Sequence, residues 1–345
     1  MNEEKVLITG GAGFIGSNLA HRLLCQGHEV TIFDNLSRSG CRRNLAWLRT
    51  STDPARLRVV EADLRDYATL LEACSGVDRI YHLAGQVAVT TSVVDPRHDF
   101  ESNALGTFNA LEAARLAGNN PIFIYASTNK VYGGMEDVGI CEEESRYRYV
   151  DRPHGIGEDQ PLDFHSPYGC SKGAGDQYVR DYARIYGLRT VVARQSCIYG
   201  YRQFGIEDQG WVAWFIIAAL KGRPITIYGN GKQVRDVLFI EDLLDAYEAM
   251  VRHVDRAAGQ VYNIGGGPAN SISIWAEFGQ HLEAQMGRPV EVRYGAWRPG
   301  DQQIYVSDIR KAEAELGWKP RTPVKEGIAC LYAWIRDNQE MFDHL

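Results

Sequence analysis

A tyrosine and a lysine four residues apart could carry out acid–base chemistry in this chain. The segment 166–172 reads Ser-Pro-Tyr-Gly-Cys-Ser-Lys and contains Tyr168 and Lys172. Ser166 suits a helix N-cap and Pro167 the first helical position, so the segment predicts a helix with both side chains on one face. A lysine ammonium beside a phenol lowers the pKa of the phenol. The phenolate could then take a proton from a substrate hydroxyl.

Thr128 is a third candidate catalytic residue. It follows a strand predicted at 121–127, and ligands of parallel sheets bind at the carboxyl ends of the strands. Its hydroxyl could share a proton with Tyr168. On spacing alone, the tyrosine–lysine pair could equally lie on a solvated helix face, and Thr128 could be an ordinary turn cap.

A glycine-rich segment near the N-terminus could bind a diphosphate. Gly10, Gly13 and Gly16 lie between a buried-strand pattern at 5–9 and a helical pattern at 14–26. Glycines at this spacing permit a tight turn and let backbone N–H groups approach a pyrophosphate, at which the helix N-terminus points. Taken alone, the pattern could be an ordinary strand-to-helix turn.

Acidic residues after the next two strands favour a dinucleotide as the ligand. Asp34 ends the strand predicted at 29–34, 18 residues beyond Gly16, where a carboxylate can accept hydrogen bonds from adenosine ribose hydroxyls. An acid there repels the extra phosphate of NADP and so favours NAD, although Arg38 keeps NADP open. Asp63 ends the third predicted strand and could contact the adenine.

The alternation of apolar and amphipathic segments predicts an α/β fold with a Rossmann-type, doubly wound parallel sheet. Continuous β-branched runs separated by helices are typical of a sheet that is covered on both faces. We expect strands at 5–9, 29–34, 57–63, 79–84, 121–127 and 190–196, and helices at 14–26, 67–74 and 100–117.

The regular alternation of apolar strand patterns and helical patterns loosens after about residue 200. We expect helices at 209–221, 241–253, 273–286, 308–316 and 324–338, and strands at 225–228 and 261–264. The sequence thus predicts an NAD-binding domain at 1–200 and a smaller C-terminal α/β substrate lobe at 201–345, from which the chain could cross back to the first domain.

Composition excludes several classes of partner. The net charge of −7 and the pI of about 5.8 disfavour nucleic acid, which would favour a basic face. No apolar run approaches the ~18 residues of a membrane span, and the N-terminus has no signal-peptide pattern. Seven scattered cysteines without a CxxC pair predict free thiols in the cytoplasm and no metal site.

Together these residues resemble the extended short-chain dehydrogenase/reductase family, and within it the nucleotide-sugar epimerases and dehydratases. The likeness covers nearly the whole chain and lies in segments 9–16, 63–64, 82–85, 103–107, 228–236 and 298–301. It implies that Lys172 also holds the nicotinamide ribose. The NAD contacts implied by the resemblance come from Gly10, Gly13, Phe14, Ile15, Gly16, Asp34, Asn35, Arg38, Asp63, Leu64, Leu83, Ala84, Gln86, Asn103, Tyr168 and Lys172.

The resemblance also implies a nucleotide sugar as substrate. Arginines such as Arg235 and Arg298 clamp the diphosphate in this family, work that suits a planar, permanently charged group. Without the resemblance, either arginine could form a surface ion pair. The implied substrate contacts are Thr128, Asn129, Cys197, Tyr228, Arg235 and Arg298. The side chains of Trp211, Phe215 and Tyr228 could stack on the base or belong to the core.

Three departures from the family pattern narrow the choice among the activities found in the family. Asn129 and Lys130 replace the Asp–Glu pair of the dehydratases, which disfavours a 4,6-dehydratase. About 40 residues separate Thr128 from Tyr168, and the extra polar segment 134–160 could line the sugar pocket or form a surface loop. Cys197 stands where relatives often have a substrate-binding asparagine.

Segments 129–130, 166–172, 202–204 and 208–211 are most similar to family members that act on CDP-paratose and CDP-tyvelose. The resemblance therefore implies an epimerase that inverts carbon 2 of a CDP-linked deoxyhexose by transient oxidation with bound NAD. The alternatives are a 4-epimerase of a UDP- or GDP-sugar, a 4,6-dehydratase, and a non-catalytic NAD-binding sensor. The family further implies a homo-oligomer, a dimer or tetramer, formed through the helices at 100–117 and 168–186.

Overall fold

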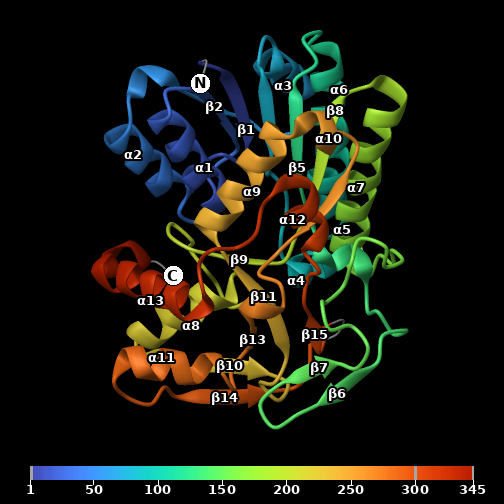
Figure 1. Cartoon of the computed structure of the whole chain (residues 1–345). Coiled ribbons are helices and arrows are strands. Elements are labelled where there is room, and N and C mark those ends of the chain that lie inside the picture. Colours follow the sequence, from blue (N-terminus) through green and yellow to red (C-terminus); the bar gives the residue numbers. More distant parts are fainter. Residues whose placement is uncertain (1–2, 299–300, 344–345) are drawn as a thin grey trace. The chain divides into compact units, whose positions relative to one another are not determined.

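Two units make up the chain in a computed structural model that describes residues 3–298 and 301–343 (Figure 1). The first unit contains Met1–Val131, Ser166–Arg194 and Tyr247–Tyr262. The second contains Tyr132–His165, Gln195–Ala246 and Asn263–Leu345. The chain therefore leaves the first unit and returns to it twice before it ends in the second.

The first unit is built on a seven-stranded sheet with the order β12-β8-β5-β4-β1-β2-β3. Adjacent strands from β5 to β3 pair in parallel. The bounds are β1 Lys5–Thr9, β2 Glu29–Asp34, β3 Leu57–Glu61, β4 Arg79–His82, β5 Ile122–Thr128, β8 Arg189–Gln195 and β12 Val261–Ile264. Each predicted strand is present within two residues at either end, which confirms the Rossmann-type α/β class.

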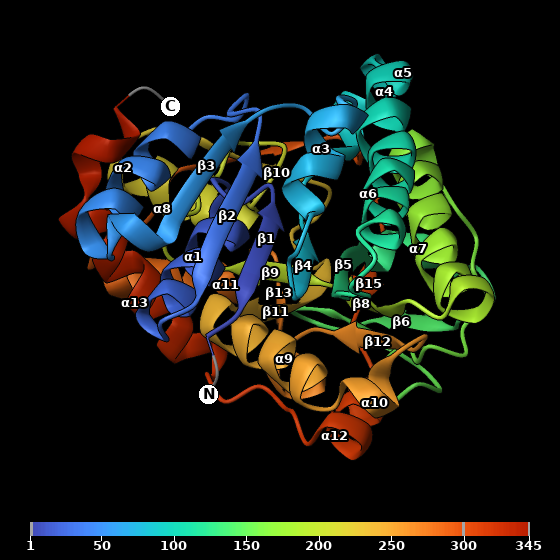
Figure 2. The same ribbon diagram turned by 90° about the horizontal axis from the view of Figure 1, so that it is seen from above.

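Helices cover both faces of this sheet. Figure 2 shows α3, α6 and α7 on one side and α1 on the other. The helices and short helical turns of this part of the chain are α1 Phe14–Cys25, α2 Cys41–Ser51, η1 Pro54–Arg56, α3 Tyr67–Cys74, α4 Val89–Val94, α5 Pro96–Phe100, η2 Glu101–Leu105, α6 Gly106–Leu116, η3 Asn129–Tyr132, α7 Ser166–Tyr186 and α10 Val254–Ala257. The helix predicted at 100–117 is interrupted, because η2 is a π-helical turn before α6.

The core beneath α3, α6 and α7 comes from alternate residues of the strands. Leu7, Phe33, Ile80 and Phe123 project into it and are fully buried. Alternation of this kind follows from the two-residue period of a β-strand. A buried core on this face fixes the helix that carries Tyr168 and Lys172 against β5.

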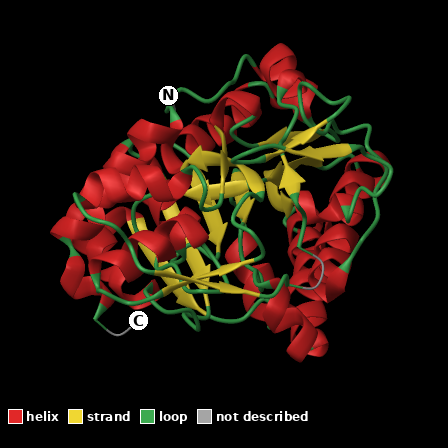
Figure 3. Ribbon diagram, turned by 90° about the horizontal axis from the view of Figure 1, so that it is seen from below, coloured by secondary structure: helices red, strands yellow, loops and turns green. Residues whose placement is uncertain are grey.

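The second unit combines short strands with helices. The strands are β6 Ile140–Glu142, β7 Tyr147–Tyr149, β9 Cys197–Tyr199, β10 Ile225–Tyr228, β11 Val234–Phe239, β13 Ser271–Ser273, β14 Val292–Gly295 and β15 Ile304–Tyr305. The helical segments are α8 Trp211–Leu220, α9 Ile240–Arg252, η4 Pro268–Asn270, α11 Phe278–Met286, α12 Arg310–Leu316, α13 Val324–Asp337 and η5 Gln339–Phe342, shown in red in Figure 3. Within residues 3–298 and 301–343, no helix is long and apolar enough to cross a membrane.

One helix prediction in this unit is wrong at its start. The helix predicted at 273–286 begins only at Phe278, because Ser271–Ser273 forms strand β13, which pairs antiparallel with β11. The Glu277 carboxylate accepts a hydrogen bond from the Ser273 backbone N–H at 2.8 Å, and this contact closes the turn between strand and helix.

The extra segment 134–160 forms an antiparallel β6–β7 hairpin. The Tyr147 backbone N–H donates to the Lys232 carbonyl at 3.1 Å, and the Arg146 guanidinium pairs with Glu277 at 2.6 Å. Tyr147 and Tyr149 are buried. The segment is therefore docked on the second unit through its backbone and its ion pair.

Candidate active site

The glycine-rich segment forms a tight turn between β1 and α1. The Gly13 backbone N–H donates to the Gly10 carbonyl at 3.1 Å, and Gly10 has a φ of +70°. A Cβ on Gly16 would lie 2.3 Å from the Gly10 carbonyl oxygen, and a Cβ on Gly10 would lie 2.7 Å from the Ala84 nitrogen. Only glycine fits at these two positions, so the turn can bring its backbone close to a ligand.

The start of α1 fits the pyrophosphate of a dinucleotide. The helix opens at Phe14 and Ile15 after Gly13, with no side chain capping its N–H groups and no acid in its first turn. Uncapped N–H groups and the positive end of the helix dipole are suited to an anion. The residues at this turn therefore fit NAD, as the sequence predicts.

The predicted adenosine-side residues gather at the ends of β2 and β3. Asp34 is buried, and its carboxylate accepts hydrogen bonds from the backbone N–H groups of Ala12 at 3.0 Å and Leu36 at 2.8 Å. Burial raises the pKa of Asp34, while these two bonds and the charge of Arg38 lower it. The Asn35 amide donates to Asp63 at 2.9 Å, two residues beyond the end of β3.

The remaining cofactor-side predictions also lie in the first unit. The Leu83 backbone N–H donates to the Thr9 carbonyl at 3.1 Å, and the Ala84 backbone N–H donates to the Thr9 hydroxyl at 3.3 Å. Leu64 packs against Gly106, whose Cβ would lie 2.9 Å from the leucine side chain. Gln86 folds back on the Ala88 backbone, with its amide 2.6 Å from the carbonyl.

Tyr168 and Lys172 lie one turn apart on α7, and both are buried. The Ser166 hydroxyl accepts from the Gly169 backbone N–H at 3.2 Å, so Ser166 caps the helix as predicted. The Lys172 ammonium donates to the Ala126 carbonyl on β5 at 2.6 Å. Thr128 ends β5, and its hydroxyl lies near enough to the Tyr168 phenol to lower the pKa of that phenol.

The pKa of Tyr168 moves in the direction opposite to the prediction. Burial raises it to about 12, while the nearby Thr128 hydroxyl and the charge of Arg38 lower it. Burial also lowers the pKa of Lys172 to about 7, so near neutral pH this lysine is only partly charged. A partly charged lysine stabilises the phenolate less than the sequence alone suggests.

A second buried cluster supports the same helix, and of its members only Asn103 was predicted from the sequence as a site residue. Ser171 donates to the Asp99 carboxylate at 2.5 Å, and the Asn103 amide donates to both Asp99 and Ser171 at 3.1 Å. The Asn103 amide oxygen has no hydrogen-bond partner although it is buried. It lies against Gly85, where a Cβ would come within 2.4 Å of it.

In the second unit, acids hold both predicted diphosphate-binding arginines. Arg235 is buried on β11 and pairs with Asp301 at 2.7 Å, while Arg298 pairs with Asp208 at 2.9 Å. Arg298 also lies over the Tyr228 ring, 3.9 Å from its centroid. Tyr228 and Arg298 are thus brought together, and their binding role remains a prediction.

The other residues predicted to bind substrate make ordinary contacts within the sheet and the core. Asn129 is buried next to Thr128, whose hydroxyl lies 3.4 Å from the Asn129 amide oxygen. Cys197 pairs with Val237 between β9 and β11, and it forms no disulfide bond. Trp211 and Phe215 stack edge-on with each other and contact Phe278, which favours their assignment to the core over a base platform.

Comparisons with known proteins place this arrangement in a family. A family profile described as GDP-mannose 4,6 dehydratase matches residues 7–331. A CDP-paratose 2-epimerase from Salmonella typhi is 47% identical, covering 96% of this chain and 98% of the relative.

Two solved structures are similar over almost the entire chain. A dTDP-glucose 4,6-dehydratase from Streptomyces venezuelae, solved with NAD bound, has a TM-score of 0.84 at 31% identity and covers 99% of both chains. A UDP-glucose 4-epimerase from Thermus thermophilus, solved in complex with NAD, has a TM-score of 0.80 at 32% identity. The match covers 96% of this chain and 99% of the Thermus thermophilus chain.

Among the described residues, no three or more side chains of the metal-binding types lie together in a way that could hold a metal ion.

Proposed function

The chain belongs to the GDP-mannose 4,6-dehydratase family of extended short-chain dehydrogenases/reductases, and we propose that it inverts carbon 2 of a CDP-linked deoxyhexose. It is an NAD-dependent enzyme of the epimerase kind. The observation that carries the proposal is the 47% identity to a CDP-paratose 2-epimerase over 96% of the chain. Asn129 and Lys130, in place of the acid pair of the dehydratases, support epimerisation over water loss.

Proton transfer is the task of Tyr168, Thr128 and Lys172. Tyr168 takes the proton of the carbon-2 hydroxyl, directly or through the Thr128 hydroxyl, and returns it after the sugar has turned. Lys172 holds the nicotinamide ribose. When bound, NAD⁺ would supply the hydride acceptor. Thr128 and Arg38 lower the pKa of Tyr168 against the effect of burial, and this favours the phenolate.

Arg235 and Arg298 hold the diphosphate while the keto sugar reorients. Their guanidinium groups are permanently charged and can each donate to two phosphate oxygens. Both arginines have carboxylate partners, Asp301 and Asp208, which keep the forks oriented. A clamp on the diphosphate leaves the sugar ring free to present its other face, and this freedom is what an epimerase needs.

Product analysis on a panel of nucleotide sugars tests the proposal. The protein is expected to convert CDP-paratose into CDP-tyvelose, detected by NMR of the purified product. Conversion of UDP-glucose alone would replace the proposal by the 4-epimerase alternative, which the Thermus thermophilus similarity favours. A product that absorbs in alkali would instead indicate a 4,6-dehydratase.

Turnover in heavy water tests the redox route separately. The inverted carbon is expected to keep the hydrogen of the substrate, because hydride transfer exchanges nothing with solvent. Deuterium at that carbon would mean direct proton abstraction and would overturn the proposed mechanism.

We also propose that the protein forms a homodimer and works in the cytoplasm. Six large apolar or aromatic side chains of η2, α6 and α7 are exposed: Leu105, Phe108, Leu116, Tyr178, Ile185 and Tyr186. Exposed apolar side chains gathered on neighbouring elements in this way are typical of a protein interface. The seven free cysteines suit a reducing compartment.

A further inference from the structure

The Lys172 ammonium is buried against two neighbouring residues of β5, Tyr125 and Ala126. It donates to the Ala126 carbonyl at 2.6 Å and lies 4.3 Å from the centroid of the Tyr125 ring. The face of an aromatic ring attracts a cation, most strongly when both groups have lost water. Tyr125 and Lys172 are both buried, so this contact is one of the few that can stabilise the charged lysine.

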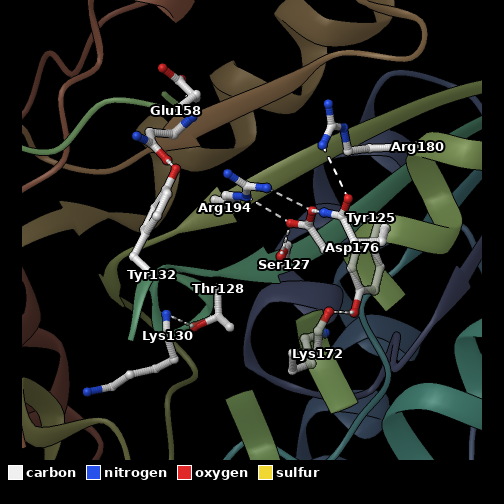
Figure 4. A network of polar contacts seen from close by, with 12 residues as sticks. Tyr125, Ser127, Thr128, Lys130, Tyr132, Glu158, Lys172, Asp176, Arg180 and Arg194 are labelled. Atoms are coloured by element: carbon white, nitrogen blue, oxygen red, sulfur yellow. Dashed lines mark hydrogen bonds and ion pairs between the residues drawn. The ribbon is translucent and has the colours of Figure 1, made fainter. Parts of the chain in front are cut away.

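Tyr125 also contacts the backbone of the helix. Its hydroxyl donates to the Lys172 carbonyl at 3.2 Å, as the dashed line in Figure 4 shows. Gly175 leaves room for this contact, because a Cβ there would lie 2.5 Å from the Tyr125 oxygen. Glycine inside a helix costs about 0.5–1 kcal/mol of stability relative to alanine, and the approach of Tyr125 accounts for its presence.

Buried polar groups lie against Tyr125 on its other side. Burial raises the pKa of the Tyr125 phenol, and the Thr107 hydroxyl, the polar neighbour there, lowers it. The Thr107 oxygen in turn lies 3.0 Å from Nε2 of His82, within hydrogen-bond distance.

The series of hydrogen bonds continues through His82. Burial, followed by the charge of Lys172, lowers the pKa of His82 to about 3, so the ring is neutral and carries one proton. Its Nδ1 lies 2.8 Å from the Thr9 hydroxyl oxygen, so one ring nitrogen donates and the other accepts. The Thr9 oxygen also accepts from the Ala84 backbone N–H at 3.3 Å. Buried hydrogen bonds therefore join Thr9, His82 and Thr107, and Thr107 lies beside Tyr125.

We propose that Tyr125 is a positioning residue that fixes the Lys172 ammonium, and that His82 and Thr107 fix Tyr125. The series of hydrogen bonds begins at Thr9, the residue before the Gly10 turn, so it links the cofactor end of β1 to the lysine of α7. The inference rests on the proposed function, in which Lys172 works beside Tyr168. The ring supplies the cation contact and the hydroxyl supplies the contact with the helix backbone.

Substitutions at position 125 separate these two contacts. Tyr125→Leu removes both and is expected to lower kcat about 10- to 100-fold, the effect of misplacing a reacting group, with KM within about twofold. Tyr125→Phe keeps the ring and is expected to lose about two- to fivefold. Leu70→Ala is the matched control, because Leu70 is fully buried in the same core on α3 and is not one of the residues that link Thr9 to Lys172. It is expected to keep kcat within about twofold.

Equal losses of kcat in Tyr125→Leu and Leu70→Ala would overturn the proposal, since general loosening of the core would then explain both. Unchanged kcat in Tyr125→Phe would overturn the role of the hydroxyl. These variants leave Tyr168, Lys172 and the glycine turn intact.

Titration of Lys172 supplies a readout that needs no substrate. Burial lowers its pKa to about 7, while Asp176 on α7 and Asp99 on α5 raise it, and His82 on β4 is neutral. Loss of the ring face in Tyr125→Leu should lower the midpoint by about half to one pH unit, measured by NMR of isotope-labelled lysine. An unmoved midpoint overturns the proposal. Because the titration is done without substrate, a shifted midpoint supports the positioning role even if no nucleotide sugar is turned over and the proposed function fails.

Discussion

Burial governs the protonation of Tyr168 and Lys172 in opposite directions. It raises the pKa of the tyrosine to about 12 and lowers that of the lysine to about 7, because each charged form has lost its water. At neutral pH the phenol is protonated and the lysine is only partly charged. The acidity of Tyr168 therefore depends on positive charge and hydrogen bonds brought close to its oxygen, of which Arg38 and Thr128 already supply a part.

Replacement of Tyr168 by phenylalanine tests its role at the level of one oxygen atom. We expect Tyr168→Phe to keep its bound NAD and to lose roughly 10²-fold or more of kcat, as the loss of an acid–base group should. Steady-state rates and the absorbance of the purified protein measure the two quantities. Tyr182→Phe is the control, because Tyr182 lies on the same helix and donates its hydroxyl proton to Glu112. Near-normal turnover in Tyr168→Phe would remove this residue from the mechanism.

The buried lysine should make the protein less stable below neutral pH. Its pKa is about 7 in the folded state, whereas an unfolded chain restores the ordinary lysine value of 10.5 and so binds the proton more tightly. The resulting penalty is complete below pH 7, where it amounts to at most about 5 kcal/mol, and it vanishes as the pH rises through 10.5. The contacts with Ala126 and Tyr125 offset part of it.

Lys172→Met is therefore expected to raise the free energy of unfolding by about 1–3 kcal/mol at pH 6 while it abolishes activity. The gain should shrink as the pH rises from about 7 toward 10, which urea unfolding at about pH 6 and pH 9.5 can measure. The exposed Lys325→Met serves as the control and should change little at either pH. A gain that grows with pH would contradict the assigned direction of the pKa shift.

Local spacing predicted the residues of the site that lie close in sequence. The tyrosine–lysine pair and the three glycines of the turn have fixed offsets, which a single sequence displays. Asp99 was missed because its partner Ser171 lies 72 residues away, and no local pattern records that contact. Asp176 could have been found, since it lies one turn beyond Lys172 on the same helix face.

Helix α7 is held to the sheet by a buried ion pair. Arg194 on β8 directs two nitrogens at the Asp176 carboxylate, each at 2.9 Å, and Ser127 on β5 donates to it at 2.7 Å (Figure 4). The side chains of Asp176 and Arg194 are almost completely buried. One carboxylate thus joins the helix of Tyr168 to two strands.

Removal of one partner of this pair should destabilise the protein strongly. Asp176→Asn leaves the Arg194 charge without its counterion, and we expect a loss of about 3–5 kcal/mol in the free energy of unfolding. The double variant Asp176→Leu with Arg194→Met should recover part of that loss, because no buried charge is left alone. Urea unfolding of Asp176→Leu, of Arg194→Met and of the double variant gives the coupling energy.

The exposed pair Arg42–Glu61 offers the comparison. Its side chains are 72% and 54% exposed, so its loss should cost no more than about 1 kcal/mol. Equal losses at the two pairs, or a double variant worse than both single variants, would contradict the anchoring role of Asp176.

Elements that read as continuous apolar runs were predicted from the sequence, whereas elements with buried charges were not. Strand β11 was missed because Arg235 and Asp236 interrupt its apolar pattern, yet all six of its residues are buried. The Gly267 backbone N–H donates to Asp236 at 3.1 Å, and Asp301 pairs with Arg235. These tertiary contacts compensate the cost of burying the two charged side chains. Helix α2 was missed because its sequence is largely polar.

At the scale of the whole chain, each unit gathers one kind of predicted residue. The cofactor-binding and catalytic candidates all belong to the first unit, together with Thr128 and Asn129. Cys197, Tyr228, Arg235 and Arg298 belong to the second. The sequence could not predict this division in detail, because each unit is assembled from three separate stretches of chain, and only long-range contacts decide where residues 132–165 and 247–262 belong.

The proposed homodimer gives a prediction for the intact protein. Tyr178 and Ile185 lie two turns apart on α7, and Phe108 on α6 packs edge-on against Tyr178 with ring centroids 5.9 Å apart. Ile185 is 66% exposed, so a charge there costs the single chain little but would be buried in a dimer. A double variant that carries both Ile185→Glu and Phe108→Glu is therefore expected to have the molar mass of a monomer in light scattering, where the unsubstituted protein has that of a dimer.

Val150→Glu is the control for this shift, because Val150 is similarly exposed, at 52%, but belongs to the second unit. It should leave the molar mass unchanged. Since neither Phe108 nor Ile185 contacts the candidate catalytic residues, the monomer should keep its bound NAD. A double glutamate variant with the mass of the unsubstituted protein would place the interface elsewhere. If the unsubstituted protein is itself a monomer, the exposed face of α6 and α7 does not mediate self-association.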